Sequence, residues 1–245
     1  MVHSYDRLSD IFFWPFLDLL MWGLTTRYIV GESGVDNKIV LALLGGLILW
    51  IFPWRSQYEI SVSLLDDIWN RNFVNIFATP VLFIEWVVTL MLIGILKGII
   101  SFAFASALAY ALYSTNIYSL GLSLLPWAGL LIIFGWVFGI LISGIIMRYG
   151  TKIQTLAWTS IYMIAPFVGV FYPVSILPAW AQNVAHWVPA SYVFDAMRKL
   201  INGTPVPMPN LIWPLILCLF YLIIAMYMLY VSYRAILKRG LISVE

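Results

Sequence analysis

Three ionisable residues stand inside apolar stretches of the chain: Asp18, Glu85 and Lys97. An unpaired charge within a bilayer costs about 3 kcal/mol or more, so such residues face a bundle interior, a partner or a water-filled path. We expect Lys97 to pair with Asp18 or Glu85 and to fix the packing of the helices that carry them. The alternative is a proton relay through these intramembrane charges, as a proton-coupled transporter would need.

The sequence offers little for other kinds of chemistry. Its one cysteine, Cys218, lies in an apolar run, and its two histidines, His3 and His186, lie near the ends of such runs. These residues make neither a disulfide framework nor a metal site, and no nucleophile stands beside a base in a known pattern. The phosphate-loop pattern G-x-x-x-x-G-K-[ST] is also absent. We therefore predict a transport subunit without catalytic or metal-binding residues; ATP and magnesium, if they are used, must bind to another polypeptide.

Long helices in a membrane must position these charges. The chain has 245 residues, of which 63% are hydrophobic and 10% charged, whereas about 25% of residues are charged in a typical soluble domain. A helix of roughly 20 apolar residues crosses a bilayer core. We expect an all-α integral membrane protein, a single domain over residues 1–245, with six transmembrane helices. The six apolar stretches are residues 11–30, 39–58, 81–113, 120–147, 155–172 and 211–233.

Basic residues near the ends of these stretches predict the orientation, because cytoplasmic ends carry the excess of Lys and Arg. With the N-terminus in the cytoplasm, the cytoplasmic side receives Arg7, Arg55, Arg71, Arg148, Lys152, Arg234, Lys238 and Arg239. The outer side then receives Arg27, Lys38, Arg198 and Lys199. Both termini are therefore expected to be cytoplasmic, in a multi-pass protein of the cell (inner or plasma) membrane. The net charge of +2 gives no reason to expect a nucleic acid partner.

The predicted cytoplasmic connection at residues 59–80 is amphipathic. Acidic, amide and hydroxyl side chains alternate there with apolar residues at helical spacing. Those apolar residues are Ile60, Leu64, Leu65, Ile68, Trp69, Phe73, Ile76 and Phe77. We expect an amphipathic cytoplasmic helix with one face on the membrane boundary. It either anchors a loop or transmits the motion of a docked ATPase to the spans.

A second patterned connection, residues 173–203, lies on the predicted outer side. Two short amphipathic helices are expected there, at residues 179–188 and 192–201. Such helices before a last span favour a re-entrant or interfacial hairpin, since backbone near the membrane must be covered by protein. The hairpin either gates a translocation path or forms a simple outer lid that aids folding. The residues of the outer gate helices would be Pro178, Trp180, Trp187, Pro189 and Arg198.

Two glycine pairs lie inside the predicted spans. Gly94 and Gly98, like Gly135 and Gly139, are separated by three residues, a pattern that lets helices approach closely. We expect these glycines to pack spans within one subunit, and a seam between two subunits is the alternative.

Two motifs give the chain a resemblance to a known family. Residues 72–81, NFVNIFATPV, are similar to the stretch with which that family closes its second intracellular connection before span three. Residues 172–203 run from Tyr-Pro through Leu-Pro, an amphipathic helix and a second Pro to a closing Arg-to-Gly helix. In these motifs, and in their order within six spans, nearly the whole chain resembles the permease subunits of ABC-2 type (type V) exporters.

The resemblance implies an assembly of several subunits. A homodimer of permeases would bind two ABC ATPase (nucleotide-binding) subunits, and substrate would move outward between the permeases. Many family members have a longer amphipathic helix before the first span, whereas only residues 1–10 precede it here. The ATPase-coupling residues would be Glu59, Leu64, Asp66, Asp67, Trp69 and Arg71.

The sequence constrains the substrate less than the architecture. Aromatic residues make up 17% of the chain, and belts of Trp and Tyr at the membrane interfaces account for many of them. Their number also suits a conduit for an amphipathic, lipid-linked or glycan-bearing substrate; polysaccharide, lipid and drug all stay open. The alternative function is an ATP-independent channel or a proton-coupled carrier that uses Asp18, Glu85 and Lys97.

Overall fold

The computed structural model describes residues 2–33, 37–70, 72, 75–76 and 79–239. Within these residues the chain forms helices joined by turns and contains no strand, which confirms the all-α prediction. The α-helices in chain order are α1 (Val2–Ser33), α2 (Asn37–Trp69), α4 (Phe83–Tyr113), α5 (Leu125–Tyr149), α6 (Leu156–Val168), α7 (Ala179–His186), α8 (Pro189–Ile201) and α9 (Ile212–Arg239).

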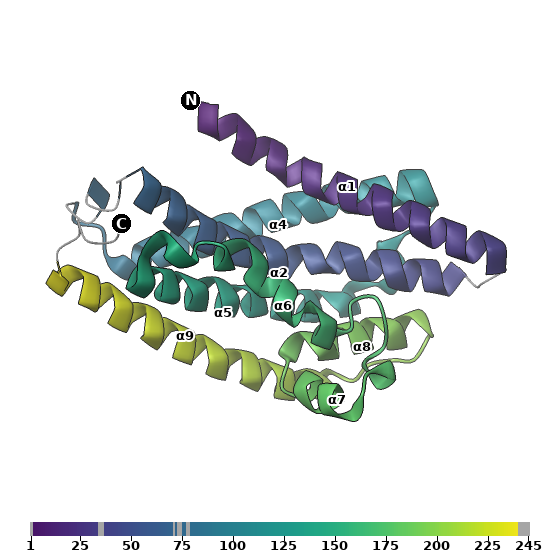
Figure 1. Ribbon diagram of the computed structural model, residues 1–245. Coiled ribbons are helices and arrows are strands. Elements are labelled where there is room, and N and C mark those ends of the chain that lie inside the picture. The colour runs from purple at the N-terminus through teal and green to yellow at the C-terminus, as the bar shows by residue number, and fades with distance from the viewer. Residues whose placement is uncertain (1, 34–36, 71, 73–74, 77–78, 240–245) are drawn as a thin grey trace.

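The long helices lie side by side in a bundle (Figure 1). α5 packs against both α2 and α9, and α4 and α1 pack against α2. In their most apolar segments, 67% of the residues of α2 and α5 are buried but only 28% of those of α4 and α9. α2 and α5 therefore form the centre of the bundle. We call the end where α2 and α9 finish the proximal end, and the end where α2 and α9 begin, beside α7 and α8, the distal end (Figure 1).

Four described helical stretches are long and apolar enough to cross a membrane: Lys38–Trp69, Phe83–Tyr113, Leu122–Ile153 and Met208–Leu237. α6 is apolar but has only 13 residues. α1 is long, with 32 residues, but Asp18 and Arg27 interrupt its apolar run and it is not among the four. The chain is thus a multi-pass membrane protein, and its count of six spans and its orientation stay predictions.

α2 is longer than the second predicted span. The second span was expected to end at residue 58, but α2 continues without a break to Trp69. Residues 59–65 are buried inside the bundle, because the polar side chains that suggested a water-facing helix are paired with neighbouring helices. The separate helix expected from residue 59 is therefore the last part of α2. Beyond it, residues 71, 73–74 and 77–78 of the predicted connection lie outside the described part of the chain.

Other boundaries differ by smaller amounts. α6 ends at Val168 rather than at residue 172, because Gly169 takes a left-handed conformation with φ 72° that terminates the helix. α5 begins at Leu125 rather than at residue 120, with Pro126 in its first turn and short 3-10 turns before it. The predicted stretches 81–113 and 211–233 correspond to α4 and to most of α9.

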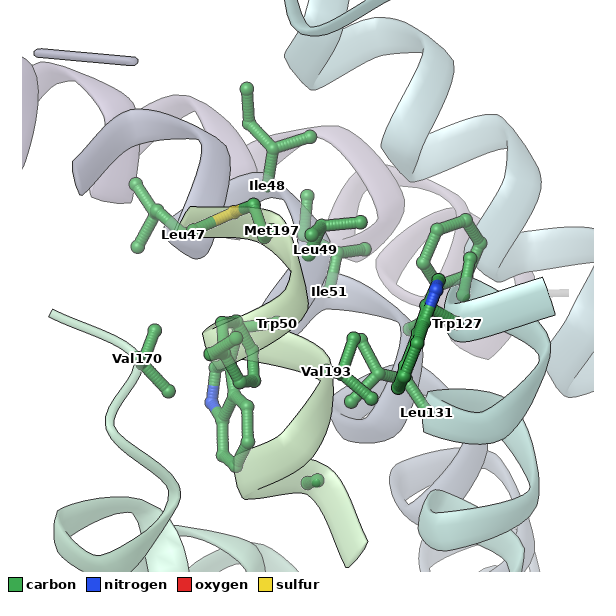
Figure 2. Packing of buried hydrophobic residues seen from close by; sticks show 14 of the residues in the cluster. Leu47, Ile48, Leu49, Trp50, Ile51, Trp127, Leu131, Val170, Val193 and Met197 are labelled. Atoms are coloured by element: carbon green, nitrogen blue, oxygen red, sulfur yellow. The ribbon is translucent and has the colours of Figure 1, made fainter. Parts of the chain in front are cut away.

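α8 belongs to the distal core. Its side chains Val193, Phe194 and Met197 are fully buried, and the helix packs against both α2 and α5. Figure 2 shows Val193 and Met197 among side chains of those two helices. The rings of Trp50 on α2 and Phe194 are 6.1 Å apart between centroids. α8 is consequently held as a core helix with a polar outer face.

Glycines bring α5 close to α2. A Cβ atom on Gly135 would lie 2.4 Å from the carbonyl oxygen of Pro53, and one on Gly139 would lie 3.0 Å from that of Gln57. On α4, which also packs against α2, a Cβ on Gly94 would lie 3.4 Å from Ser56 Cα. Gly135 and Gly139 therefore pack α5 closely against α2 within this chain, as predicted. Gly94 and Gly98 also face α2, but there a Cβ would make ordinary contacts at 3.4 and 3.6 Å.

Candidate functional site

A run of polar side chains on α2 is buried at mid-bundle. Arg55, Ser56 and Gln57 are consecutive polar residues, and from Gln57 to Ser63 the helix alternates polar and other residues. Most of the polar side chains contact a neighbouring helix. We call these side chains of α2, together with their ionic partners on α1 and α4, the polar layer. It consists of Asp10, Arg55, Gln57, Glu59, Ser61, Ser63 and Lys97.

Glu59 and Lys97 form the first ion pair of the polar layer. Lys97 Nζ donates to both carboxylate oxygens of Glu59, each at 2.7 Å. The side chain of Glu59 is 5% exposed and that of Lys97 18%. Ser63 Oγ also donates to the carboxylate, at 3.5 Å. The pair joins the middle of α4 to α2.

Arg55 and Asp10 form the second ion pair. Arg55 Nη1 donates to Asp10 Oδ2 at 2.9 Å, and Nη2 donates to the backbone carbonyl of the same residue. The guanidinium carbon also lies 4.5 Å from the ring centre of Trp54. Arg55 is only 1% exposed. This pair joins α1 to α2 well inside the helix, whereas the sequence prediction placed Arg55 at the end of a span.

A neutral network joins α2 to α6. Gln57 Nε2 donates to the carbonyl oxygen of Ala157 at 2.7 Å and to Ser61 Oγ at 2.6 Å. Ser61 Oγ is also within 3.2 Å of the Ala157 carbonyl. Among the side chains that the structure describes, Gln57 Oε1 is buried without a hydrogen-bond partner. Such an atom in a packed interior is usually satisfied by water.

The polar layer clamps α2 from several directions. Residues four apart share one face of a helix, and residues two apart point to nearly opposite faces. Gln57 and Ser61 therefore face α6, while Glu59 and Ser63 face α4. The carboxylates and cations of this layer are paired with each other, so the layer holds helices in register and is not arranged for acid–base catalysis.

The proximal end of α2 reaches the protein surface. Asp66 and Asp67 are half-buried and Trp69 is exposed. Asp67 accepts hydrogen bonds from Trp86 Nε1 at 3.4 Å and from Asn72 Nδ2 at 3.2 Å. The indole rings of Trp69 and Trp158 stack with centroids 6.0 Å apart. These contacts order the last turn of α2 while leaving part of it accessible.

The structure divides the six predicted ATPase-coupling residues. Glu59 is engaged with Lys97 and Leu64 is fully buried, so neither presents its side chain at the proximal surface. Asp66, Asp67 and Trp69 remain candidates for a contact. Arg71 lies outside the described residues.

The three intramembrane charges do not meet. Lys97 pairs with Glu59 rather than with Asp18 or Glu85, so the predicted pairing was wrong. Glu85 is exposed in the first turn of α4, where its carboxylate accepts from the Leu82 N–H at 2.9 Å. Asp18 is half-buried on α1. Glu59 was missed as the partner because the sequence pattern placed it in a cytoplasmic helix outside the spans.

The predicted outer gate residues lie at the distal end. Pro178 precedes α7 and Pro189 is buried in the first turn of α8. Trp180 and Trp187 are 64% and 57% exposed; the ring of Trp187 lies 6.2 Å from that of Trp213 on α9. Exposed indoles at one end of a bundle suit a membrane interface.

Arg198 fastens α8 to the chain that follows α6. Its Nη2 atom donates to the carbonyls of Gly169, Val170 (3.2 Å) and Tyr172 (2.9 Å). Burial lowers the pKa of the guanidinium, and the nearby carboxylate of Asp195 opposes that shift. The guanidinium therefore donates hydrogen bonds to backbone carbonyls that would have helical partners if α6 continued beyond Val168.

Two hollows accompany these elements. One, of about 540 Å³, lies at the distal end between α1, α2 and α4. The other, of about 430 Å³, is an apolar groove between α5, α6 and α9, and its lining includes Phe134, Phe138, Ile164, Trp187 and Ile224. In the part of the chain that the structure describes, no cluster of three or more His, Cys, Asp or Glu residues is placed to hold a metal ion.

Most of the chain matches the model of one known protein family. The model of a family described as ABC-2 family transporter protein matches residues 34–227, which include α2 to α8, most of α9 and nearly all of the polar layer. No curated protein matches the chain. Because the match covers most of the sequence, the chain belongs to the ABC-2 family of transporter proteins, as a membrane component of transport.

Proposed function

We propose that this chain is the membrane-spanning permease of an ATP-driven exporter, energised by a separate ABC ATPase subunit that binds ATP and magnesium. Family membership supports the role of permease, since members of the family typically work with an ATPase. In this proposal two copies form the translocation unit in the cell membrane, both termini are cytoplasmic, and substrate moves outward.

The single observation that carries the proposal is the unbroken course of α2. Its 33 residues make a rod of about 50 Å, whereas the hydrocarbon core of a bilayer is about 30 Å thick. With the apolar run 39–58 in the hydrocarbon, the turns from Glu59 to Trp69 project on the cytoplasmic side. A subunit that pushes on Trp69 would thus act on a helix that crosses the whole membrane.

The apolar groove supports an amphipathic substrate, lipid-linked or glycan-bearing. Side chains of α5, α6 and α9 line it, with Trp187 at its distal side. A groove of this composition accepts a hydrocarbon chain and offers almost nothing to an isolated polar solute. Within the class of amphipathic substrates the groove does not discriminate.

The alternative function is a channel or proton-coupled carrier that uses Asp18, Glu85 and Lys97. It has less support, because these three charges lie apart. Glu85 and Lys97 are twelve positions apart on α4, or about 18 Å along the helix. Lys97 is held by two short hydrogen bonds to Glu59. A relay would have to break that pair.

Co-purification tests the proposal. The affinity-tagged chain is expressed with untagged products of the neighbouring genes, and the purified complex is reconstituted into liposomes. We expect an ATPase in stoichiometric amount and transport that requires ATP. Transport by the pure chain without an ATPase would refute the proposal.

Charge reversal at the proximal end tests the coupling surface. The double variant Asp66→Lys and Asp67→Lys should bind the ATPase more weakly and uncouple ATP hydrolysis from transport. Asp195→Lys is the matched control, because Asp195 is an exposed aspartate at the distal end of the same bundle. Wild-type coupling in the double variant, or labelling of Asp66→Cys from outside the cell, would remove this end of α2 from the mechanism.

A further inference from the structure

The distal hollow between α1, α2 and α4 has a polar side and an apolar side. Its volume of about 540 Å³ lies within the range of roughly 300–1,000 Å³ that small-ligand sites occupy. We call it the distal pocket. Its polar lining consists of Arg27, Tyr113, Ser114, Thr115, Asn116 and Ser119. Its apolar lining consists of Gly23, Val40, Leu41 and Leu112.

Arg27 gives the distal pocket a positive charge. No carboxylate is among the described residues that line it, and Arg27 shares this lining with Tyr113. A guanidinium binds phosphate oxygens through two parallel N–H donors, which makes arginine the preferred partner for this group. Tyr113, Thr115 and Ser119 donate their hydroxyls to backbone carbonyls. The charge of Arg27 and the side chains of Ser114 and Asn116 are therefore what favour an anionic ligand.

The turn after α4 holds neutral donors beside that charge. Asn116 accepts from the Tyr118 N–H through its Oδ1 atom at 3.0 Å, which leaves its NH₂ group for another acceptor. Ser114 caps α4 with φ 53°, and within the described residues it is the one non-glycine residue with a positive φ. Glycine is the usual residue at such a cap. The serine at this position places a hydroxyl in the pocket lining and strains the backbone.

Tyr113 fixes the shape of the pocket. Its ring lies over Gly23, where a Cβ atom would come within 2.2 Å of the ring. Its hydroxyl donates to the Leu19 carbonyl at 3.0 Å. These contacts hold α1 against α4, so Arg27, one turn beyond Gly23, keeps its position beside the turn after α4.

We propose that the distal pocket binds the phosphate of an anionic headgroup. The phosphate lies between Arg27 and the side chains of Ser114 and Asn116, and the first carbons of the attached chain lie on Val40 and Leu41. A bundle end is the depth at which lipid headgroups stand. The site is independent of the ATP-driven function; in the proposed orientation it belongs to the outer leaflet.

Binding to the full chain in dodecyl maltoside micelles tests this site, because the detergent carries no phosphate. The probes are dihexanoyl phosphatidic acid, dihexanoyl glycerol and inorganic phosphate, measured by microscale thermophoresis. We expect dihexanoyl phosphatidic acid to bind and dihexanoyl glycerol to bind at least tenfold more weakly. Inorganic phosphate that binds as tightly as the lipid, with the same need for Arg27, would support the anion site and identify a free anion as its ligand.

Variants separate the pocket from general attraction to positive charge. Arg27→Gln should weaken binding of phosphatidic acid about tenfold, the effect of losing one charge-assisted contact. Ser114→Gly removes the hydroxyl while relieving the strained cap, so the chain keeps its fold and binding should weaken about threefold. Lys199→Gln, an exposed cation at the same end, should change nothing.

Three results would overturn the proposal. They are equal binding of phosphatidic acid by Arg27→Gln and the wild type, equal binding of dihexanoyl glycerol and phosphatidic acid, and no binding of any probe. The measurement involves neither ATP nor transport, so its failure leaves the exporter proposal standing, and the failure of that proposal leaves this site standing.

Discussion

Removing one partner of the Glu59–Lys97 pair should destabilise the protein more than removing both. Glu59→Gln leaves the Lys97 ammonium without a countercharge inside the bundle, and Lys97→Met leaves the carboxylate in the same position. The double variant removes both charges. Replacing a whole buried pair by uncharged residues is often neutral, whereas breaking it leaves an uncompensated charge.

The structure sets the expected size of the effect. Breaking a fully buried pair costs about 3–5 kcal/mol. Lys97 is 18% exposed, so its ammonium group can recover some hydration and the cost should fall just below that range. We expect each single variant to lose about 2–3 kcal/mol of unfolding free energy. For a chain of this length that lowers the melting temperature by roughly 5–10 °C.

The wild type, the two single variants and the double variant form a double-mutant cycle. Their thermal unfolding in detergent is followed by the fluorescence of buried tryptophans. The control pair is Asp195 and Lys199, which have the same 2.7 Å separation but are 59% and 49% exposed. Asp195→Asn should cost about 0.5 kcal/mol or less, as exposed pairs do. The reasoning fails if the single variants have the melting temperature of the wild type. It also fails if the double variant has a lower melting temperature than both single variants.

Three further predictions test other contacts. Gly135→Ala should destabilise the bundle by about 1–3 kcal/mol through overpacking against Pro53, whereas Gly129→Ala on the same helix, with nothing within 4 Å of a new Cβ, should melt within 1 °C or so of the wild type. Arg198→Gln should leave three carbonyls short of a donor, which should speed proteolysis after α6 by severalfold while the long helices stay intact. Cys218, which is buried, should react with a maleimide only after denaturation, and labelling of the native protein in minutes would contradict the packing of α5 and α9.

The apolar pattern was sufficient to locate the long helices. Stretches 81–113 and 211–233 correspond to α4 and α9 because lipid-facing helices need continuous apolar surface, and that requirement is local to the sequence. The distal helices also followed from local signals. Pro178 precedes α7 as expected. Pro189, by contrast, lies in the first turn of α8, where proline is tolerated, so that helix begins three residues before the expected residue 192.

The polar layer could not be recognised in the same way. Periodicity shows which residues share a face but does not show whether that face meets water or another helix. Glu59, Ser61 and Ser63 were therefore taken for the water-facing side of a loop helix. One signal was available: polar residues spaced by two cover both faces of a helix, as Gln57, Glu59 and Ser61 do, which fits a helix surrounded by protein better than one on a membrane surface.

The contacts of α2 determine how a load on its proximal end would spread. Arg55 ties the helix to α1, Gln57 to α6 and Glu59 to α4, all within little more than one turn. Gly135 and Gly139 hold α5 against the same turns, with no room for a methyl group at Gly135 and little at Gly139. Bending α2 at this level would break ion pairs that lie out of water, whereas moving the helices together breaks none of them. A push at Trp69 should therefore displace α1, α2, α4, α5 and α6 as one body, and the distal ends of these helices would carry the motion across the membrane.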